Sequence, residues 1–272
     1  MSSINVEMDD ARLEVFRNLN ERSTGRGEDP DSFVVEGALI VRRLLESDYR
    51  VRTIVVDAGR DLETLGTIPA GVDVVTLARD SIEKLAGFSF HRGFLASADR
   101  PPLQTSDEVS WEGSGLSLAL VGVSDMENVG SMLRSAAAFG VRRVLIDDRT
   151  VDPLSRRSIR VSMGAALGME FVRFKRIAED ISKLARRDVV TLAATPAEDS
   201  LPIDAVDWGD RPVLLLVGNE ARGLSKRVQN AATHRVHIPM DRRAMETLVD
   251  SLNVSVATAI LLHELRRAAA RR

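Results

Sequence analysis

The sequence predicts an α/β fold, in which a parallel sheet covered by helices on both faces follows a smaller α/β domain. Apolar runs of strand length alternate with helical patterns in residues 116–272, which is typical of a buried parallel sheet. The chain has 272 residues, of which 44% are hydrophobic, so it is long enough for one large domain or two ordinary ones. A polar segment rich in Pro, Gly and Ser, DRPPLQTSDEVSWEGSG, separates the two halves. We therefore expect domains at 1–100 and 116–272, joined by a linker at 101–115.

The first domain is expected to be a small α/β sandwich. A helical pattern of apolar residues covers residues 9–22. The expected elements that follow are a strand at SFVVEG (32–37), a helix at ALIVRRLLES (38–47), strands at VRTIVVD (51–57) and VDVVTL (72–77), and a helix at DSIEKLAG (80–87). In this last helix Asp80 or Ser81 is the candidate N-cap, and Gly87 is the candidate end.

The second domain repeats this alternation with longer apolar strands. We expect strands at LSLALVGV (116–123), VRRVLID (141–147), DVVTLAAT (188–195), PVLLLVG (212–218) and RVHIPM (235–240). The expected helices are NVGSMLRSAAAFG (128–140), EDISKLARR (179–187) and the closing SLNVSVATAILLHELRRAAARR (251–272). In sheets of this kind ligands bind beyond the carboxyl ends of the strands.

Composition excludes several classes of function. The chain has no cysteine, which excludes disulfides and thiol catalysis, and its four histidines form no convincing metal site. No apolar stretch reaches about 18 residues and the N-terminus has no apolar core, so we expect a soluble, cytoplasmic protein without a signal peptide. The net charge of −3 hides an asymmetry, because residues 1–115 carry −8 and residues 116–272 carry +5. A basic half suits a polyanionic partner, although it is equally compatible with a solvated surface.

Unusual polar residues follow the ends of three expected strands. In VSDMENVGSMLRSAAAFG, Asn128 is a candidate N-cap and Gly140 a candidate helix end. Arg134 lies off the apolar face of that helix, which is formed by Val129, Met132, Leu133 and Ala136. A capping asparagine and a solvated arginine are the plain structural alternative.

The other two segments are LLLVGNEARGLS (214–225) and IPM (238–240) with DSLNVSVA (250–257). The first is not a phosphate loop, since no Gly-Lys-Ser/Thr follows it, and it lacks the spacing of a dinucleotide fingerprint. Its alternative is an ordinary strand-to-helix turn. In the second, Asp250 or Ser251 is the candidate cap of the last helix, and Asn253 is an amide that needs partners inside an apolar stretch.

Together the three segments resemble the sequence motifs of the SpoU/TrmH branch of the SPOUT methyltransferases, which methylate RNA ribose 2'-hydroxyls with S-adenosyl-L-methionine. DPLSRRSIRVSMGAAL (152–167) is similar to the Ser-Met-Gly-Ala stretch of that family, and FVVEGALIVRRLLES and HRGFLAS resemble its L30e-like substrate-binding domain. The resemblance implies an α/β-knot fold with a C-terminal trefoil knot, which strand counting alone would not predict. It also implies a homodimer with the active site near the subunit interface, and the histidine and cysteine content leads us to expect no metal.

The resemblance implies a role for individual residues. The cofactor is expected to be held, largely by backbone groups, by Val217, Gly218, Asn219, Glu220, Ile238, Met240, Leu252, Asn253 and Ala257. Arg134 matches the arginine at the 2'-hydroxyl, and because a guanidinium stays protonated we expect it to clamp the neighbouring phosphate and polarise the hydroxyl. Asn128 and Glu220 are expected to orient Arg134 or the ribose, and Ser251 and Asn253 to complete the catalytic pocket. Gly218 is expected to let the backbone approach the ligand closely.

RNA is the expected partner, with ribosomal RNA favoured over transfer RNA. The residues expected to hold it are Arg156, Arg157, Arg160, Arg222, Lys226 and Arg227. Two features depart from the family pattern. The first is the loop DRRAMETLVD (241–250), which is long and has no glycine. The second is the acidic first domain. If that domain binds RNA, we expect it to use a local basic face at Arg42, Arg43, Arg50 and Arg52; the alternative is that it contacts protein.

Three alternatives stay open at this point. One is a transfer-RNA 2'-O-methyltransferase. The second is an RNA-binding or ribosome-assembly protein that keeps the fold but turns over weakly because of the altered loop. The third, a nicotinamide-dependent oxidoreductase, is weakened by the missing dinucleotide fingerprint.

Overall fold

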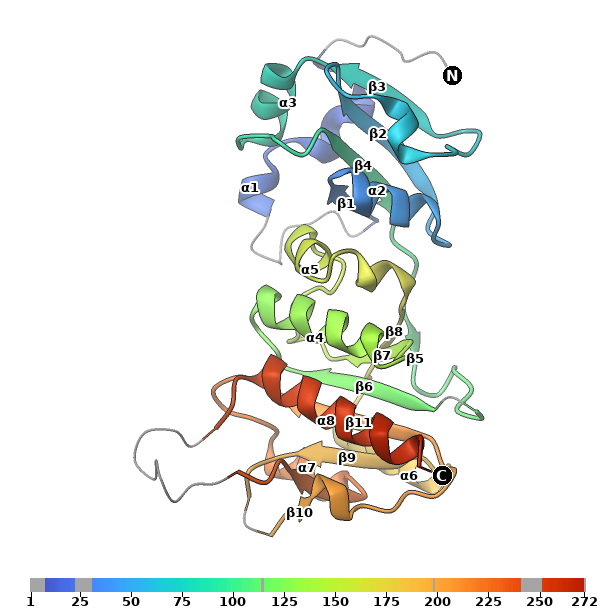
Figure 1. The fold of residues 1–272 in the computed structure, drawn as a ribbon, viewed down its shortest axis with the longest axis vertical. Coiled ribbons are helices and arrows are strands. Elements are labelled where there is room, and N and C mark those ends of the chain that lie inside the picture. Colours follow the sequence, from blue (N-terminus) through green and yellow to red (C-terminus); the bar gives the residue numbers. More distant parts are fainter. Residues whose placement is uncertain (1–7, 23–30, 114, 198, 241–250, 272) are drawn as a thin grey trace. The chain divides into compact units, whose positions relative to one another are not determined.

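A computed structural model describes residues 8–22, 31–113, 115–197, 199–240 and 251–271 and divides the chain into two units. Unit 1 comprises Met1–Pro102 and Asp152–Gly168, and unit 2 comprises Leu103–Val151 and Met169–Arg272. The chain therefore passes between the units three times (Figure 1). This division departs from the expected boundaries, because the segment after Val151 leaves the second half of the chain and packs with the first.

Unit 1 is built on a four-stranded sheet with the order β1-β4-β2-β3, in which only the β2–β3 pair is parallel. A buried cluster that includes Phe16, Val55, Ile82 and Leu95 packs between this sheet and neighbouring helices. The strands are β1 (Ser32–Glu36), β2 (Val51–Asp57), β3 (Asp73–Leu77) and β4 (Phe94–Asp99). The helices are η1 (Ala11–Phe16), α1 (Leu19–Arg22), α2 (Ala38–Leu45), η2 (Leu62–Leu65), α3 (Arg79–Ala86), α5 (Arg156–Val161) and η3 (Ala165–Gly168).

Two local predictions for unit 1 are wrong. The single helix expected at 9–22 is two short ones, because Asn18 between them has a positive φ of 50° and its N–H donates to the carbonyl of Leu85 at 2.9 Å. Asparagine tolerates that left-handed conformation better than most residues. Helix α3 begins at Arg79, so its N-cap is Ala78 and not Asp80 or Ser81, whereas Gly87 ends it in the left-handed conformation as expected.

A buried carboxylate holds α5 within unit 1. Glu36, which is 2% exposed, accepts from Arg156 at 2.6 Å and from Arg160 at 3.3 Å, and Arg92 lies 3.4 Å away. The guanidinium of Arg156 also lies over the ring of Phe88, 4.5 Å from its centroid. Arg156 and Arg160 therefore serve an internal ion cluster, which differs from the free RNA-binding surface expected of them.

Unit 2 is an eight-stranded sheet with the order β10-β12-β9-β11-β6-β7-β8-β5, and every pair in it is parallel, as predicted. Its strands are β5 (Gln104–Thr105), β6 (Leu116–Val121), β7 (Arg143–Ile146), β8 (Glu170–Arg173), β9 (Val190–Ala194), β10 (Leu201–Pro202), β11 (Val213–Gly218) and β12 (His234–His237). Strand β5 falls inside the segment expected as a linker, and Val109 and Trp111 of the same segment are buried in the unit 2 core.

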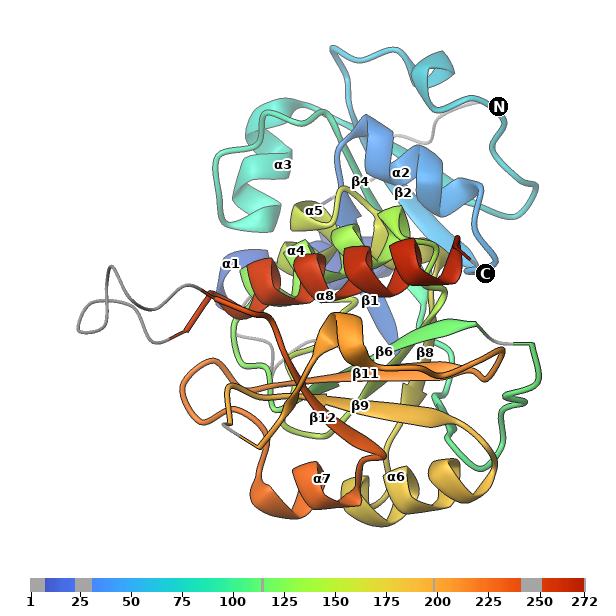
Figure 2. The ribbon, with the colours of Figure 1, turned by 60° about the horizontal axis from the view of Figure 1, so that its bottom comes forward.

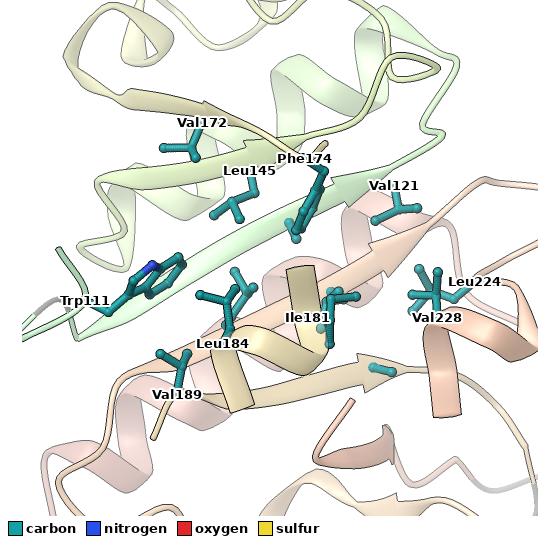
Figure 3. Close-up of a cluster of buried hydrophobic side chains, with 14 of the residues drawn as sticks. Trp111, Val121, Leu145, Val172, Phe174, Ile181, Leu184, Val189, Leu224 and Val228 are labelled. Atoms are coloured by element: carbon teal, nitrogen blue, oxygen red, sulfur yellow. The ribbon is translucent and has the colours of Figure 1, made fainter. Parts of the chain in front are cut away.

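Helices cover both faces of this sheet. Helices α4 (Met126–Ala138) and α8 (Val254–Ala269) lie side by side on one face, and α6 (Ile177–Arg186) and α7 (Lys226–Ala231) lie on the other (Figure 2). Figure 3 shows the core under α6 and α7, where Leu145, Ile181 and Leu184 meet side chains from neighbouring strands. A short helix η4 (Ile203–Ala205) completes the unit. The trefoil knot implied by the resemblance stays a prediction.

Within the part of the chain that the structure describes, no helix is both long and apolar enough to span a membrane.

Replacing Glu36 by glutamine is expected to lower the free energy of unfolding by about 1–3 kcal/mol, because three partly exposed arginines lose the buried carboxylate that accepts from or faces them. Urea unfolding of the full chain measures this. Glu14→Gln is the matched control, since the Glu14 side chain is 68% exposed in its pair with Arg17 and should contribute less than about 1 kcal/mol. Equal effects of the two substitutions would contradict the structural role of Glu36.

Candidate functional site

A pocket of about 530 Å³ opens at the carboxyl ends of β9, β11 and β12, which are neighbours in the sheet of unit 2. Its volume is that of a small-molecule site. The walls come from the segments after these strands and from the start of α8: Ala194, Thr195, Pro196, Ala197, Gly218, Asn219, Glu220, Gly223, His237, Ile238, Pro239, Met240, Ser251, Leu252, Val254, Ala257 and Leu261.

The turn after β11 folds back on its own strand. The N–H of Gly223 donates to the carbonyl of Asn219 at 2.9 Å, and Gly223 has a positive φ of 60°. A Cβ on Gly218 would lie 2.4 Å from the carbonyl carbon of Gly223 and 2.5 Å from the nitrogen of Leu224. Gly218 is thus required by the close approach of its own chain, whereas we expected it to make room for a ligand.

The side chain of Asn219 joins this turn to the loop between β6 and α4. Its amide nitrogen donates to the carbonyl of Gly122 at 2.9 Å. Its amide oxygen accepts from the N–H groups of Ala221 and Arg222 at 3.1 and 3.0 Å. The side chain therefore fixes both the turn itself and its distance from β6.

The carboxylate of Glu220 makes the second connection to the same loop. It accepts from the N–H and hydroxyl of Ser124 at 3.2 and 3.1 Å, and from the N–H of Asp125 at 3.1 Å. The side-chain amides of Asn128 and Asn219 donate to it at 3.1 and 3.2 Å.

Burial raises the pKa of Glu220, but its hydrogen bonds, including those from Asn128, Ser124 and Asp125, lower it by more, so the net pKa lies below the ordinary value. Glu220 is therefore an ionised acceptor whose lone pairs are already engaged. A carboxylate in that state is a poor proton acceptor at neutral pH.

Two asparagines connect the starts of α4 and α8. Asn253 donates from its side-chain amide to the side-chain oxygen of Asn128 at 3.1 Å. Asn253 is also the N-cap of α8, since its oxygen accepts from the N–H groups of Ser255 and Val256 at 2.8 and 3.4 Å. Glu220, Asn128 and Asn253 thus form a continuous chain of hydrogen bonds across three segments.

The predicted helix caps differ from this arrangement. The N-cap of α4 is Asp125, which accepts from the N–H groups of Glu127 and Asn128, so Asn128 lies inside the first turn. At α8 the cap is Asn253 and not Ser251, while Asp250 lies outside the described residues, as does the rest of the 241–250 loop.

Arg134 lies apart from this cluster. It is exposed on α4, six residues after Asn128, which places it about 9 Å along the helix and about 120° around it. No ion pair of Arg134 is found among the described residues, and the contacts of Glu220 do not include it. Within one chain, the expected orientation of Arg134 by Asn128 or Glu220 is therefore not seen.

Most residues expected at the cofactor do line the pocket. Gly218, Asn219, Glu220, Ile238, Met240, Leu252 and Ala257 do so, together with Ser251 from the expected catalytic set. Val217 is buried in β11 with 2% exposure, and neither Val217 nor Asn253 lines the pocket.

Sequence reasoning missed the wall formed by Thr195, Pro196 and Ala197, and missed His237 at the end of β12. A signal for the first three was present, because Thr195 ends the strand expected at DVVTLAAT (188–195) and the other two follow its carboxyl end.

Three of the residues expected to hold RNA belong to unit 1 and three to unit 2. Arg222 and Lys226 are exposed around the turn that leads into α7, and Arg227 lies 3.5 Å from Glu179. Arg157 is half-buried in α5, in the same helix as Arg156 and Arg160. Among the described residues no group of three or more His, Cys, Asp or Glu side chains has the arrangement of a metal site.

Comparison with known proteins gives concordant results. The model of the SpoU rRNA Methylase family matches residues 115–263. An uncharacterized tRNA/rRNA methyltransferase of Mycobacterium tuberculosis is 34% identical over 265 residues, covering 95% of this chain and 90% of the relative. The 23S rRNA (guanosine-2'-O-)-methyltransferase RlmB of Acinetobacter baylyi is 31% identical, covering 84% of this chain and 94% of the relative.

Among solved structures, a putative RNA methyltransferase of the TrmH family from Porphyromonas gingivalis matches with a TM-score of 0.78 and 27% identity. The match covers 97% of this chain and 100% of that structure.

Replacing Gly218 by alanine is expected to destabilise the protein by about 1–3 kcal/mol, because the added methyl meets backbone and not a movable side chain. Urea unfolding measures the loss. Gly168→Ala is the control, since a Cβ there meets nothing within 4 Å and its φ is not positive. A Gly218→Ala protein as stable as Gly168→Ala would contradict the proposed packing of the turn.

Glu220→Gln is expected to destabilise the protein at pH 7 and to do so less in acid. The pKa of Glu220 is lower in the folded state than in the unfolded chain, so its contribution is complete above the unfolded pKa of about 4.3 and is lost as the pH falls through the lower folded pKa. Urea unfolding of both proteins at pH 7, 5 and 3.5 should show that the difference between their free energies of unfolding becomes smaller only at pH 3.5.

The exposed Glu112 supplies the control for this pH series, and Glu112→Gln should change stability little at any pH. If Glu220→Gln lowers the free energy of unfolding by the same amount at every pH, the ionised carboxylate is not what stabilises the loop.

Proposed function

Because this chain belongs to the SpoU rRNA Methylase family, we propose that it methylates a ribose 2'-hydroxyl of RNA with S-adenosylmethionine as the methyl donor. The observation that carries the proposal is the pocket at the carboxyl ends of β9, β11 and β12. Its walls are formed by the same GNEARGLS, IPM and SLNVSVA segments that carry the family resemblance.

Ribosomal RNA is the substrate that we favour. It is supported by the RlmB relative, whose name specifies a guanosine 2'-hydroxyl of 23S rRNA, and which this chain matches over 94% of its length. The relative from Mycobacterium tuberculosis is named for either transfer or ribosomal RNA, so transfer RNA is the alternative.

The residues of the pocket fit the proposed cofactor. When bound, S-adenosylmethionine supplies an electrophilic methyl group on a positively charged sulfur. Ile238, Met240 and Leu252 offer apolar surface suited to an adenine ring, and the carboxylate of Glu220 places a negative charge in the wall. The backbone of the Gly218 turn supplies polar groups that need no side-chain rearrangement.

The chain's own side chains limit how the hydroxyl proton can leave. A guanidinium stays protonated at neutral pH, so Arg134 is not the acceptor. The lone pairs of Glu220 are taken by five donors, so Glu220 is not a free base either. We infer that Arg134 clamps an RNA phosphate beside the hydroxyl and polarises it, and that the proton passes to that phosphate or to water.

A second copy of the chain would complete this arrangement. Arg134 is exposed on α4, Val256 on the adjacent α8 is 48% exposed, and Leu252, two residues before α8, is 36% exposed. Large apolar side chains exposed beside a pocket suit a protein interface. We propose a homodimer in which the α4–α8 face of each copy meets its partner, so that Arg134 serves a site at the interface.

Transfer of labelled methyl from S-adenosylmethionine to separated unmodified ribosomal and transfer RNAs tests the function. Label is expected in ribosomal RNA, in linkages that resist alkaline hydrolysis because their 2'-oxygen is methylated. Label found only on bases would overturn the ribose assignment. Absence of cofactor binding by calorimetry would favour an RNA-binding protein without turnover.

Arg134→Lys is the variant that tests the clamp within this assay. Lysine keeps the charge but loses the bidentate fork, which is expected to lower kcat by roughly 10- to 100-fold while cofactor binding is retained. Arg142→Lys, at an exposed arginine at the amino end of β7, should leave kcat unchanged. Near-normal turnover by Arg134→Lys would exclude the clamp.

A further inference from the structure

A buried carboxylate outside the pocket has no part in the chemistry described so far. Asp147 directly follows β7 and is 6% exposed. One of its oxygens, Oδ1, accepts from the N–H of Gly122 at 2.8 Å, from the N–H of Thr150 at 3.0 Å and from the hydroxyl of Thr150 at 2.6 Å. Its second oxygen lies 3.5 Å from Arg149. Burying a carboxylate is costly unless donors surround it, and these donors come from two separate segments.

Thr150 binds the loop between β6 and α4 at several points. Its hydroxyl oxygen lies 3.0 Å from the nitrogen of Gly122 and 3.3 Å from that of Val123, and it lies 2.9 Å from the carbonyl of Leu120. The N–H of Val151 donates to the carbonyl of Val123 at 2.9 Å. Residues 147–151 therefore hold one side of this loop by both backbone and side chain.

The other side of the same loop is held by the turn of the pocket. Asn219 binds the carbonyl of Gly122, and Glu220 binds Ser124 and the N–H of Asp125. The N–H of Gly122 donates to Asp147 on one side, and its carbonyl accepts from Asn219 on the other. Gly122 has a positive φ of 68°, a conformation that other residues rarely adopt. Helix α4, which carries Asn128 and Arg134, begins at Met126 directly after the loop.

We propose that Asp147 and Thr150 are positioning residues of the methyl transfer. They set the conformation of the β6–α4 loop, and through it the position of the Glu220 carboxylate and of the first turn of α4. This inference rests on the proposed function. It assigns the two residues no contact with cofactor or RNA, since neither lines the pocket.

The substitution Thr150→Val tests this, because it removes the hydroxyl and keeps the shape of the side chain. Thr150→Ser restores the hydroxyl. The matched control is Thr191→Val in β9, where a fully buried threonine accepts from the N–H of Thr233 at 2.9 Å near the amino end of the strand. Thr150→Val and Thr191→Val each lose one hydrogen-bonded hydroxyl, but only the hydroxyl of Thr150 contacts the β6–α4 loop.

Three measurements on the full chain separate positioning from stability. Thr150→Val is expected to lower kcat by roughly 10- to 100-fold, since small misplacements remote from the chemistry cost that much. Calorimetric Kd for S-adenosylhomocysteine should stay within about threefold, because the pocket walls are retained. Amide hydrogen exchange at Gly122 and Val123 should become faster by about tenfold. Thr150→Ser should recover kcat, and Thr191→Val should lower Tm without lowering kcat.

Either of two results would overturn the proposal. One is an unchanged kcat in Thr150→Val, and the other is a loss of activity that follows Tm equally in Thr150→Val and Thr191→Val. Wild-type protein that binds no cofactor and transfers no methyl would overturn the proposed function instead. In that case the exchange rates at Gly122 and Val123 still decide whether Thr150 holds the loop.

Discussion

The hydrogen bonds to Glu220 are the interaction on which the site depends. One carboxylate receives five donors from the turn after β11, from the loop after β6 and from the first turn of α4. Asn128 extends the set to the start of α8 through Asn253. Because these segments are far apart in the sequence, no local propensity fixes their spacing, and the charge-assisted bonds do so instead. These bonds thereby fix the position of the pocket wall relative to α4, the helix that bears Arg134.

Much of the fold follows from short-range patterns in the sequence. The apolar runs at β6, β9 and β11 are long and continuous, so both their type and their parallel arrangement were predictable. The strand-end rule for open α/β sheets then located the pocket. By contrast, β5 (Gln104–Thr105) is too short for a periodic signal, and β8 (Glu170–Arg173) has only two apolar residues, Phe171 and Val172, between charged ones.

The details that failed depend on partners remote in sequence. Asp125 and Asn128 are both good capping residues; Asp125 caps α4, whereas Asn128 donates to Glu220, which lies 92 positions away in the sequence. The basic run at Arg156 and Arg160 was predicted to be a surface for RNA, yet its carboxylate partner is Glu36, which lies more than a hundred positions away in the sequence. Gly218 lines the pocket, but a glycine is required at this position because the chain returns close to it at Gly223.

The triple passage of the chain between the units limits how the protein can be divided. A fragment that starts at Leu103 keeps the whole sheet of unit 2, but it also keeps Asp152–Gly168, whose packing partners are in unit 1. In such a fragment α5 would have lost β1, against which it packs, and Arg156 would have lost Glu36. The half that carries the pocket therefore cannot be excised by a single cut, because any continuous fragment from β6 to α8 also contains Asp152–Gly168.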